Sequence, residues 1–154
     1  MKKILIILVL VTLLLNNACK KDPAKGAIVS THMDISYQDK SGNDLLDSKT
    51  PGYYSSSNIH VYKMVNGVKT EVNNVMMDSP HDFFIFKEKS DSISYLRIFL
   101  DNPTYLQLNQ NTIDTLTCDI EKSNGNTLLK KFWYNGQLYW DDIAKPQVIT
   151  IIKD

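Results

Sequence analysis

One loop of the sequence gathers side chains whose oxygen atoms could hold a metal ion. Asp39, Asn43, Asp44 and Asp47 supply three carboxylates and an amide within nine residues. Calcium takes oxygen ligands from acidic loops of this kind. The spacing differs from that of an EF-hand loop, and Asp and Asn are also ordinary turn residues. We therefore expect turns here, with a calcium site as the weaker interpretation.

Other residue types common in catalytic centres show no spacing that predicts a reaction. His32, His60 and His81 lie far apart and form no metal-ligand motif. The sequence contains neither a Gly-x-Ser-x-Gly elbow nor a Gly-rich phosphate loop. We therefore expect no catalytic residue and no cofactor beyond the weak calcium candidate. The least supported alternative is a small hydrolase of the cell envelope that uses carboxylates such as Asp44 and Asp47.

Aromatic side chains crowd one predicted hairpin near the C-terminus. Residues 128–134 and 137–140 flank Asn135-Gly136, a pair that favours a type I′ turn. On this register one face carries Leu129, Trp133, Leu138 and Trp140, and the other carries Phe132, Tyr134 and Tyr139. Outward rings could stack on a sugar, an apolar ligand or a partner protein, so the candidates for ligand binding are Trp133, Tyr134, Tyr139 and Trp140. The competing interpretation, which we favour, buries Trp133 and Trp140 and leaves the tyrosines along the sheet edge or under a loop.

The first eighteen residues have the layout of an export signal. Lys2 and Lys3 precede an apolar run over residues 4–15, which only Thr12 interrupts. This run is too short for an ordinary membrane span, which needs about 20 residues, but it suits a signal peptide.

A cysteine stands directly after this signal, preceded by the small residue Ala18. The order of basic residues, apolar run, small residue and cysteine resembles the lipobox of bacterial lipoproteins, whose cysteine receives a diacylglyceryl group before a peptidase cuts in front of it. The chain departs from that pattern at Asn16, where Leu is usual, although Leu15 lies one place earlier. The resemblance implies that Cys19 is acylated and that its acyl chains hold the protein on a membrane.

The resemblance divides the chain into a signal peptide (1–18), a polar tether (19–26) and one domain (27–154). The chain balances 17 basic against 17 acidic residues, and removing Lys2 and Lys3 leaves 15 basic residues. Because a nearly neutral chain does not suit nucleic acid, we expect no such partner. Cys118 lies on the apolar side of an alternating segment, which predicts a core position.

Short alternating segments separated by turn signals predict an all-β domain. Met33, Ile35 and Tyr37 alternate with polar residues, as in a half-buried strand. Residues 59–65 and 68–72 flank Asn66-Gly67, which predicts another type I′ hairpin, with Val65 opposite Val68. We expect further strands at 83–87, 93–100, 105–108, 112–122 and 148–152. The leading fold is one antiparallel β-sandwich, immunoglobulin-like or transthyretin-like, with a β-barrel as the alternative.

Two features of the mature chain carry a second resemblance. One is Gly-Asn-Asp-Leu-Leu-Asp (42–47) after the first strand, with an Asn-Gly hairpin following it; the other is the start Cys-Lys-Lys-Asp. Both are similar to features of small uncharacterised Bacteroidetes lipoproteins with β-sandwich domains. The resemblance implies a lipid-anchored cell-envelope protein, held at the outer membrane, and it supplies no reaction.

We therefore expect a non-catalytic binding or structural module at the cell envelope. Its partners would be membrane lipid, through Cys19, and a glycan or an envelope protein. The alternative function is carbohydrate binding by a surface lipoprotein in glycan capture. Lys20 and Lys21 precede Asp22, and this order leaves open whether the domain lies on the periplasmic or the surface face.

Overall fold

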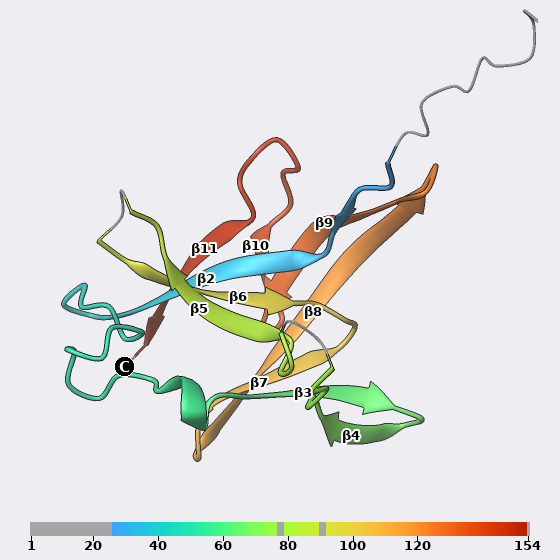
Figure 1. Ribbon diagram of the computed structural model, residues 1–154. Coiled ribbons are helices and arrows are strands. Elements are labelled where there is room, and N and C mark those ends of the chain that lie inside the picture. Colours follow the sequence, from blue (N-terminus) through green and yellow to red (C-terminus); the bar gives the residue numbers. More distant parts are fainter. Residues whose placement is uncertain (1–25, 77–78, 90–91, 154) are drawn as a thin grey trace, which may run out of the picture.

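The computed structural model describes residues 26–76, 79–89 and 92–153. In these residues the chain forms eleven β-strands in two packed sheets and one short 3₁₀ helix, η1 (Ser56–Asn58) (Figure 1). The all-β, sandwich-like fold is therefore confirmed, and the alternative of a closed barrel is wrong. The described residues contain no helix that is long and apolar enough to cross a membrane. The predicted signal peptide and Cys19 lie outside the described residues.

The two sheets differ in size, and we name them sheet A and sheet B. Sheet A has seven strands, in the order β1 (Val29–Ser30), β9 (Asn126–Tyr134), β8 (Thr112–Ser123), β7 (Thr104–Asn109), β3 (His60–Val65) and β4 (Val68–Glu71), with β10 (Gln137–Trp140) also paired to β9. Sheet B has four strands, in the order β11 (Val148–Lys153), β2 (His32–Asp39), β6 (Ser94–Phe99) and β5 (Phe83–Lys87). Two pairs are parallel, β1 with β9 and β11 with β2.

The core lies between the sheets and follows the predicted alternation. Met33, Ile35 and Tyr37 of β2 are fully buried, and Leu106 and Leu116 meet them from sheet A, also fully buried. Burying a side chain of this size contributes about 1.5–3 kcal/mol. Alternation in the sequence therefore identified the core side of these strands correctly.

Cys118 lies among the core residues on β8, as predicted. Its Sγ is 3.7 Å from the carbonyl oxygen of Asp101. Burial is the main cause that raises the pKa of the thiol to about 11. Since the thiolate is the reactive form, Cys118 is a poor nucleophile at neutral pH.

The hairpin of β3 and β4 has the predicted register. Val65 pairs with Val68, and Lys63 pairs with Thr70. Asn66 and Gly67 have φ angles of 52° and 80°, so both have the positive φ that a type I′ turn requires. Val65 and Val68 are exposed, because the tip of the hairpin extends beyond the core.

The C-terminal hairpin differs from its prediction because both strands contain a β-bulge. Asp119 of β8 pairs with Lys131, whereas its neighbour Ile120 pairs with Leu129. Lys130 is therefore an extra residue in β9, and an extra residue reverses the alternation of a strand. This reversal lets Leu129 and Phe132, three positions apart, both point into the core.

The second bulge lies in β10. Leu138 pairs with Trp133 while Trp140 pairs with Phe132, so Tyr139 is the extra residue. Phe132 and Trp140 consequently face the core, and Trp133 is half-buried on the opposite face beside an exposed Leu138. The predicted grouping of Leu129, Trp133, Leu138 and Trp140 on one face is therefore wrong, as is the core position favoured for Trp133.

Candidate binding groove

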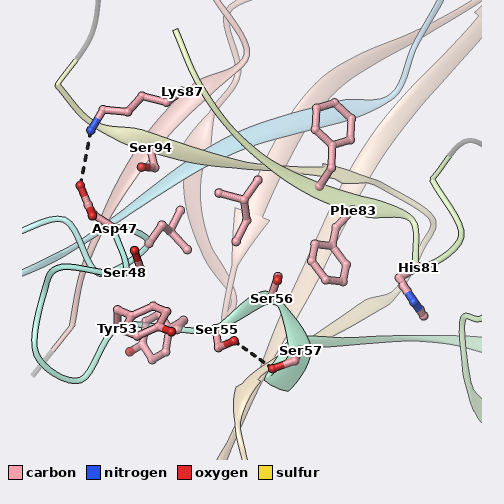
Figure 2. A pocket seen from close by; sticks show the side chains of 14 residues that line it. Asp47, Ser48, Tyr53, Ser55, Ser56, Ser57, His81, Phe83, Lys87 and Ser94 are labelled. Atoms are coloured by element: carbon pink, nitrogen blue, oxygen red, sulfur yellow. Dashed lines mark hydrogen bonds and ion pairs between the residues drawn. The ribbon is translucent and has the colours of Figure 1, made fainter.

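A groove of about 840 Å³ opens between the edge of sheet B and the long loop after β2. β5 forms one wall, and the loop over residues 46–57 forms the other. Figure 2 shows Tyr53, Ser55 and Ser57 on the loop side and Phe83 and Lys87 on the strand side. The groove therefore joins two segments that are far apart in the sequence.

β5 forms the first wall because it ends sheet B. Within the described residues it pairs with β6 on one side and has no neighbouring strand on the other. Alternation turns Phe83 and Ile85 toward the core and puts Phe84 and Phe86 on the outer face. The free edge of an almost wholly apolar strand therefore borders the groove.

The loop wall is fixed by an anchor at its start. Leu45 and Leu46 are buried and attach the start of the loop to the core. The Asp44 carboxylate accepts hydrogen bonds from the backbone N–H groups of Leu46 (2.9 Å) and Ser94 (2.7 Å). The Tyr54 N–H donates to the Leu45 carbonyl (2.7 Å). The loop is therefore tied to β6, next to the strand that forms the opposite wall.

Hydroxyl groups and aromatic rings share the lining of the groove. The hydroxyls of Ser55 and Ser57 lie 2.9 Å apart at η1 (Figure 2). Tyr53 is 40% exposed, whereas Tyr54 packs edge-on against the buried ring of Tyr37, with ring centroids 5.9 Å apart. Burial raises the pKa of Tyr54, so its hydroxyl stays protonated. The lining therefore offers neutral donors and acceptors beside ring faces.

Charged groups lie toward the two ends of the groove, where Figure 2 shows Lys87 and His81. The Lys87 Nζ is 3.6 Å from the Asp47 carboxylate, which also accepts a hydrogen bond from the Lys49 N–H (3.0 Å). That backbone hydrogen bond is the main cause that lowers the pKa of Asp47, and the charge of Lys87 adds to it. His81 Nδ1 lies 3.3 Å from the Val72 carbonyl oxygen.

The lining gives little support to a carboxylate acting as a general acid. A general acid at neutral pH needs a carboxyl group whose pKa is raised, whereas the pKa of Asp47 is lowered. Asp47 is the one carboxylate among the described residues that line the groove. Asp44 uses both of its oxygens to hold the loop. The geometry therefore adds no support for a hydrolase built on these two residues.

The predicted calcium candidates lie at the start of the same loop, but their oxygens serve other partners. Asp39 accepts hydrogen bonds from the Ser41 N–H (2.8 Å), the Asn43 N–H (2.9 Å) and the Asn43 side-chain amide (2.7 Å). Asp44 accepts hydrogen bonds from the backbone N–H groups of Leu46 and Ser94, and Asp47 accepts one from that of Lys49. In the part of the chain that the structure describes, no group of three His, Cys, Asp or Glu side chains is placed to hold a metal ion. Calcium binding stays a prediction.

The four aromatic candidates of the C-terminal hairpin do not share one surface. Tyr134 and Trp140 are buried, and the Trp140 Nε1–H donates to the Pro146 carbonyl (3.0 Å). Tyr139 is exposed and packs edge-on against Tyr134, with ring centroids 6.0 Å apart. Trp133 faces the other side of sheet A. A ligand therefore cannot stack on these rings as a single platform.

A second aromatic group covers the outer face of sheet B. Four rings of β5 and β6 lie with neighbouring centroids 5.7–6.2 Å apart, and they belong to Phe84, Phe86, Tyr95 and Phe99. The Arg97 guanidinium lies over the rings of Phe84 (5.7 Å) and Phe86 (5.1 Å). It also donates two hydrogen bonds, each of 2.7 Å, to the Asp34 carboxylate. The charge of Arg97 is therefore balanced within this face.

The sequence pattern indicated neither the groove nor the outer aromatic group. Two signals were available. The segment 38–57 has twenty residues without a strand pattern, and loops of that length in small domains are often functional. The phrase Phe-Phe-Ile-Phe (83–86) has apolar residues in both phases of a strand, so one phase had to face outward or meet a partner.

Comparisons of the chain with protein families, with curated proteins and with solved structures found no match. The fold and the groove together define a structural class for this protein. It is a two-sheet, all-β domain with a hydroxyl- and ring-lined groove beside the edge strand β5.

Proposed function

We propose that this chain is a lipid-anchored protein of the cell envelope whose β-sandwich is a non-catalytic binding module, with the groove beside β5 as its binding site. The observation that carries the proposal is the groove. Its volume of about 840 Å³ lies in the range of ligand sites, and its described lining combines hydroxyls, ring faces and few charges. Polar groups among apolar surfaces give such sites both affinity and orientation.

The anchoring part of the proposal is supported by the sequence that precedes the domain. An apolar run, a small residue and Cys19 stand in the order of a bacterial lipobox, and the start of the mature chain is similar to that of Bacteroidetes lipoproteins. Each buried methylene of an acyl chain contributes about 0.8 kcal/mol, and two or more chains give stable anchoring. We propose the outer membrane, on either the periplasmic or the surface face.

We further infer an immunoglobulin-like or transthyretin-like arrangement within the sandwich class. Two largely antiparallel sheets packed over a core of alternating residues support this inference. Strand order and connections, rather than core composition, distinguish these folds.

Metabolic labelling tests the anchor. In cells that express the full chain and receive an alkyne-tagged fatty acid, the wild-type protein should carry the tag and sediment with membranes. Cys19→Ala should lose the tag, whereas Cys118→Ala, the matched control, should keep it. An untagged wild-type protein, or a tagged Cys19→Ala variant, would contradict the proposal.

Photo-crosslinking in intact cells tests the binding site. A photoreactive amino acid replaces Ser56 in the groove or, as the control, Val68 at the exposed hairpin tip. We expect a discrete adduct from position 56 and none from position 68. No adduct from position 56, or the same adducts from both positions, would argue against the groove. The adduct would be an envelope protein or a glycan, the two ligand classes that the sequence leaves open.

A further inference from the structure

We infer that the free edge of β5 takes up an extended segment of a partner protein, which lies in the groove as an additional strand of sheet B. This inference rests on the proposed binding function of the groove and names the class of its ligand. Adding a strand to an exposed sheet edge is a recurrent way of recognising peptides.

The backbone of β5 carries N–H and C=O groups that point away from β6, on the side of the groove. The Phe99 N–H donates to the Asp82 carbonyl (2.9 Å), and bonded positions alternate along an antiparallel pair. Phe84 and Phe86 therefore bond to β6, whereas Phe83, Ile85 and Lys87 direct their N–H and C=O groups away from it.

One side chain already uses an outward group, which agrees with this assignment. The Ser79 hydroxyl donates to the Phe83 carbonyl (3.0 Å). Within the described residues, the outward groups of Ile85 and Lys87 have no strand beside them. They repeat every second residue, about 6.6 Å apart. An extended peptide presents matching groups at the same interval, and a sugar does not.

The opposite wall suits the far side of an inserted strand. Ser55, Ser56 and Ser57 place three hydroxyls along the loop; one proton of the Ser55–Ser57 pair is used between them, and the remaining donor and acceptor positions can meet a ligand. They can therefore meet the second row of backbone groups that an added strand would bring into the groove.

The side chains of the groove indicate what the segment contains. Its inward residues would meet Leu46, Tyr54 and Phe83, which favours apolar side chains at alternate positions. Lys87 is 3.6 Å from Asp47, beyond ordinary hydrogen-bond distance, and its side chain is 42% exposed. An acidic residue of the segment can pair with it. The occupant is therefore an alternating apolar strand with a carboxylate at the Lys87 end.

The sequence of β5 is typical of an edge strand that another segment covers. Exposed edges invite aggregation, and proteins usually protect them with prolines, inward charges or bulges. The Phe-Phe-Ile-Phe stretch has none of these, and Lys87 is the one charge of β5.

Selection of peptides on the full-length protein in detergent micelles tests the inference. From a phage-displayed random hexapeptide library we expect a family with alternating apolar residues and an acidic residue at one end. N-methylation of the alternate amides that face β5 should weaken binding about tenfold or more, because each lost backbone hydrogen bond leaves its partner on β5 unsatisfied. N-methylation of the amides that point away from β5 should reduce the affinity less.

Three protein variants complete the test. Ile85→Pro removes an outward N–H and should reduce affinity about tenfold. The control Lys69→Pro removes an outward N–H from β4, the edge of sheet A, and should leave affinity unchanged. Lys87→Glu should weaken binding of the selected peptide. A peptide whose acidic residue is exchanged for lysine should bind the Lys87→Glu variant again. If Ile85→Pro fails to fold, the N-methylated peptides and the charge exchange still test the inference.

Three results would overturn the inference: no peptide is enriched, both N-methylation phases act equally, or Ile85→Pro binds like the wild type. A glycan array distinguishes this failure from failure of the proposed function. A glycan that binds and is blocked by Ser56→Trp, with no peptide enriched, overturns the strand inference and leaves the groove as a binding site. The absence of any peptide, glycan or Ser56 crosslink overturns both.

Discussion

Asp114 illustrates how a single side chain joins the two sheets. Its carboxylate, buried on β8, accepts hydrogen bonds from the Tyr134 hydroxyl (2.5 Å), the Asn135 amide (2.8 Å) and the Lys153 ammonium (2.8 Å). Tyr134 belongs to sheet A and Lys153 to the last strand of sheet B. Burial by itself would raise the pKa of Asp114, but the three hydrogen bonds outweigh it and lower the pKa.

Replacing Asp114 should destabilise the fold strongly. Asp114→Ala leaves Lys153 and Tyr134 without their buried acceptor, and breaking such a pair costs about 3 kcal/mol. Urea denaturation measures the change, and the exposed Asp142→Ala is a suitable control. A loss below about 1 kcal/mol would show that the network contributes little.

The same carboxylate should make stability depend on pH. Because its folded pKa lies below the unfolded value of about 3.9, its contribution is present above roughly pH 4 and is lost as the pH falls through the folded pKa. Asp114→Asn should therefore show a flatter decline in stability below pH 4 than the wild type.

The acidic loop offers a test of the weaker metal interpretation. Because Asp39 and Asp47 already accept backbone hydrogen bonds, we expect thermal melting curves in calcium and in EGTA to superimpose. An ion at a hundred times its dissociation constant would add about 2.7 kcal/mol. A clear upward shift of the melting temperature in calcium would restore Asp39, Asn43, Asp44 and Asp47 as a site.

At the scale of elements, the bulge of β9 decides which side chains form the core. Alternation predicted the existence and approximate limits of the strands, and the Asn-Gly turns predicted two hairpins. Alternation could not predict that Lys130 has no partner on β8. A bulge depends on how β9 pairs with β8 rather than on the composition of β9. The face of Trp133 was therefore misassigned, whereas Trp140 does lie in the core as favoured.

Deleting Lys130 should be far more harmful than truncating it. Without the extra residue, β9 can keep either Leu129 or Phe132 in the core but not both, so we expect a loss above about 4 kcal/mol or failure to fold. Lys130→Ala removes an exposed pair with Glu121 (2.9 Å) and should cost less than about 1 kcal/mol. Chemical denaturation compares the two, and a stable deletion variant would mean that the bulge is dispensable.

The position of the candidate groove was beyond prediction for a related reason, although its two walls each left a signal in the sequence. Its walls come from the loop 46–57 and from β5, and the pairing order of sheet B brings them together. Local patterns carry no information on which strand ends a sheet. The burial of Leu45 and Leu46 was predictable because an aliphatic pair in a polar loop has few other uses.

At the scale of the whole molecule, the groove runs alongside β5, with its Phe83 end level with Met33 near the start of β2 and its Lys87 end toward the end of β2. Ile28 bonds to Asn126 at one end of sheet A. From there β2 runs eight residues, about 26 Å, to the loop of the groove (Figure 1). A domain tethered through Cys19 would therefore hold the Lys87 end of the groove farther from the chain's entry point than the Phe83 end.

Backbone amide exchange in β5, followed by NMR on the full-length protein in micelles, tests the central claim most directly. In the free protein we expect slow exchange at Phe84 and Phe86, which bond to β6, and fast exchange at Ile85 and Lys87, which face the groove. Adding a selected peptide should slow exchange at Ile85 and Lys87 and leave the other two unchanged. Protection of Ile85 in the free protein, or no change on binding, would contradict the claim that this edge is the binding site.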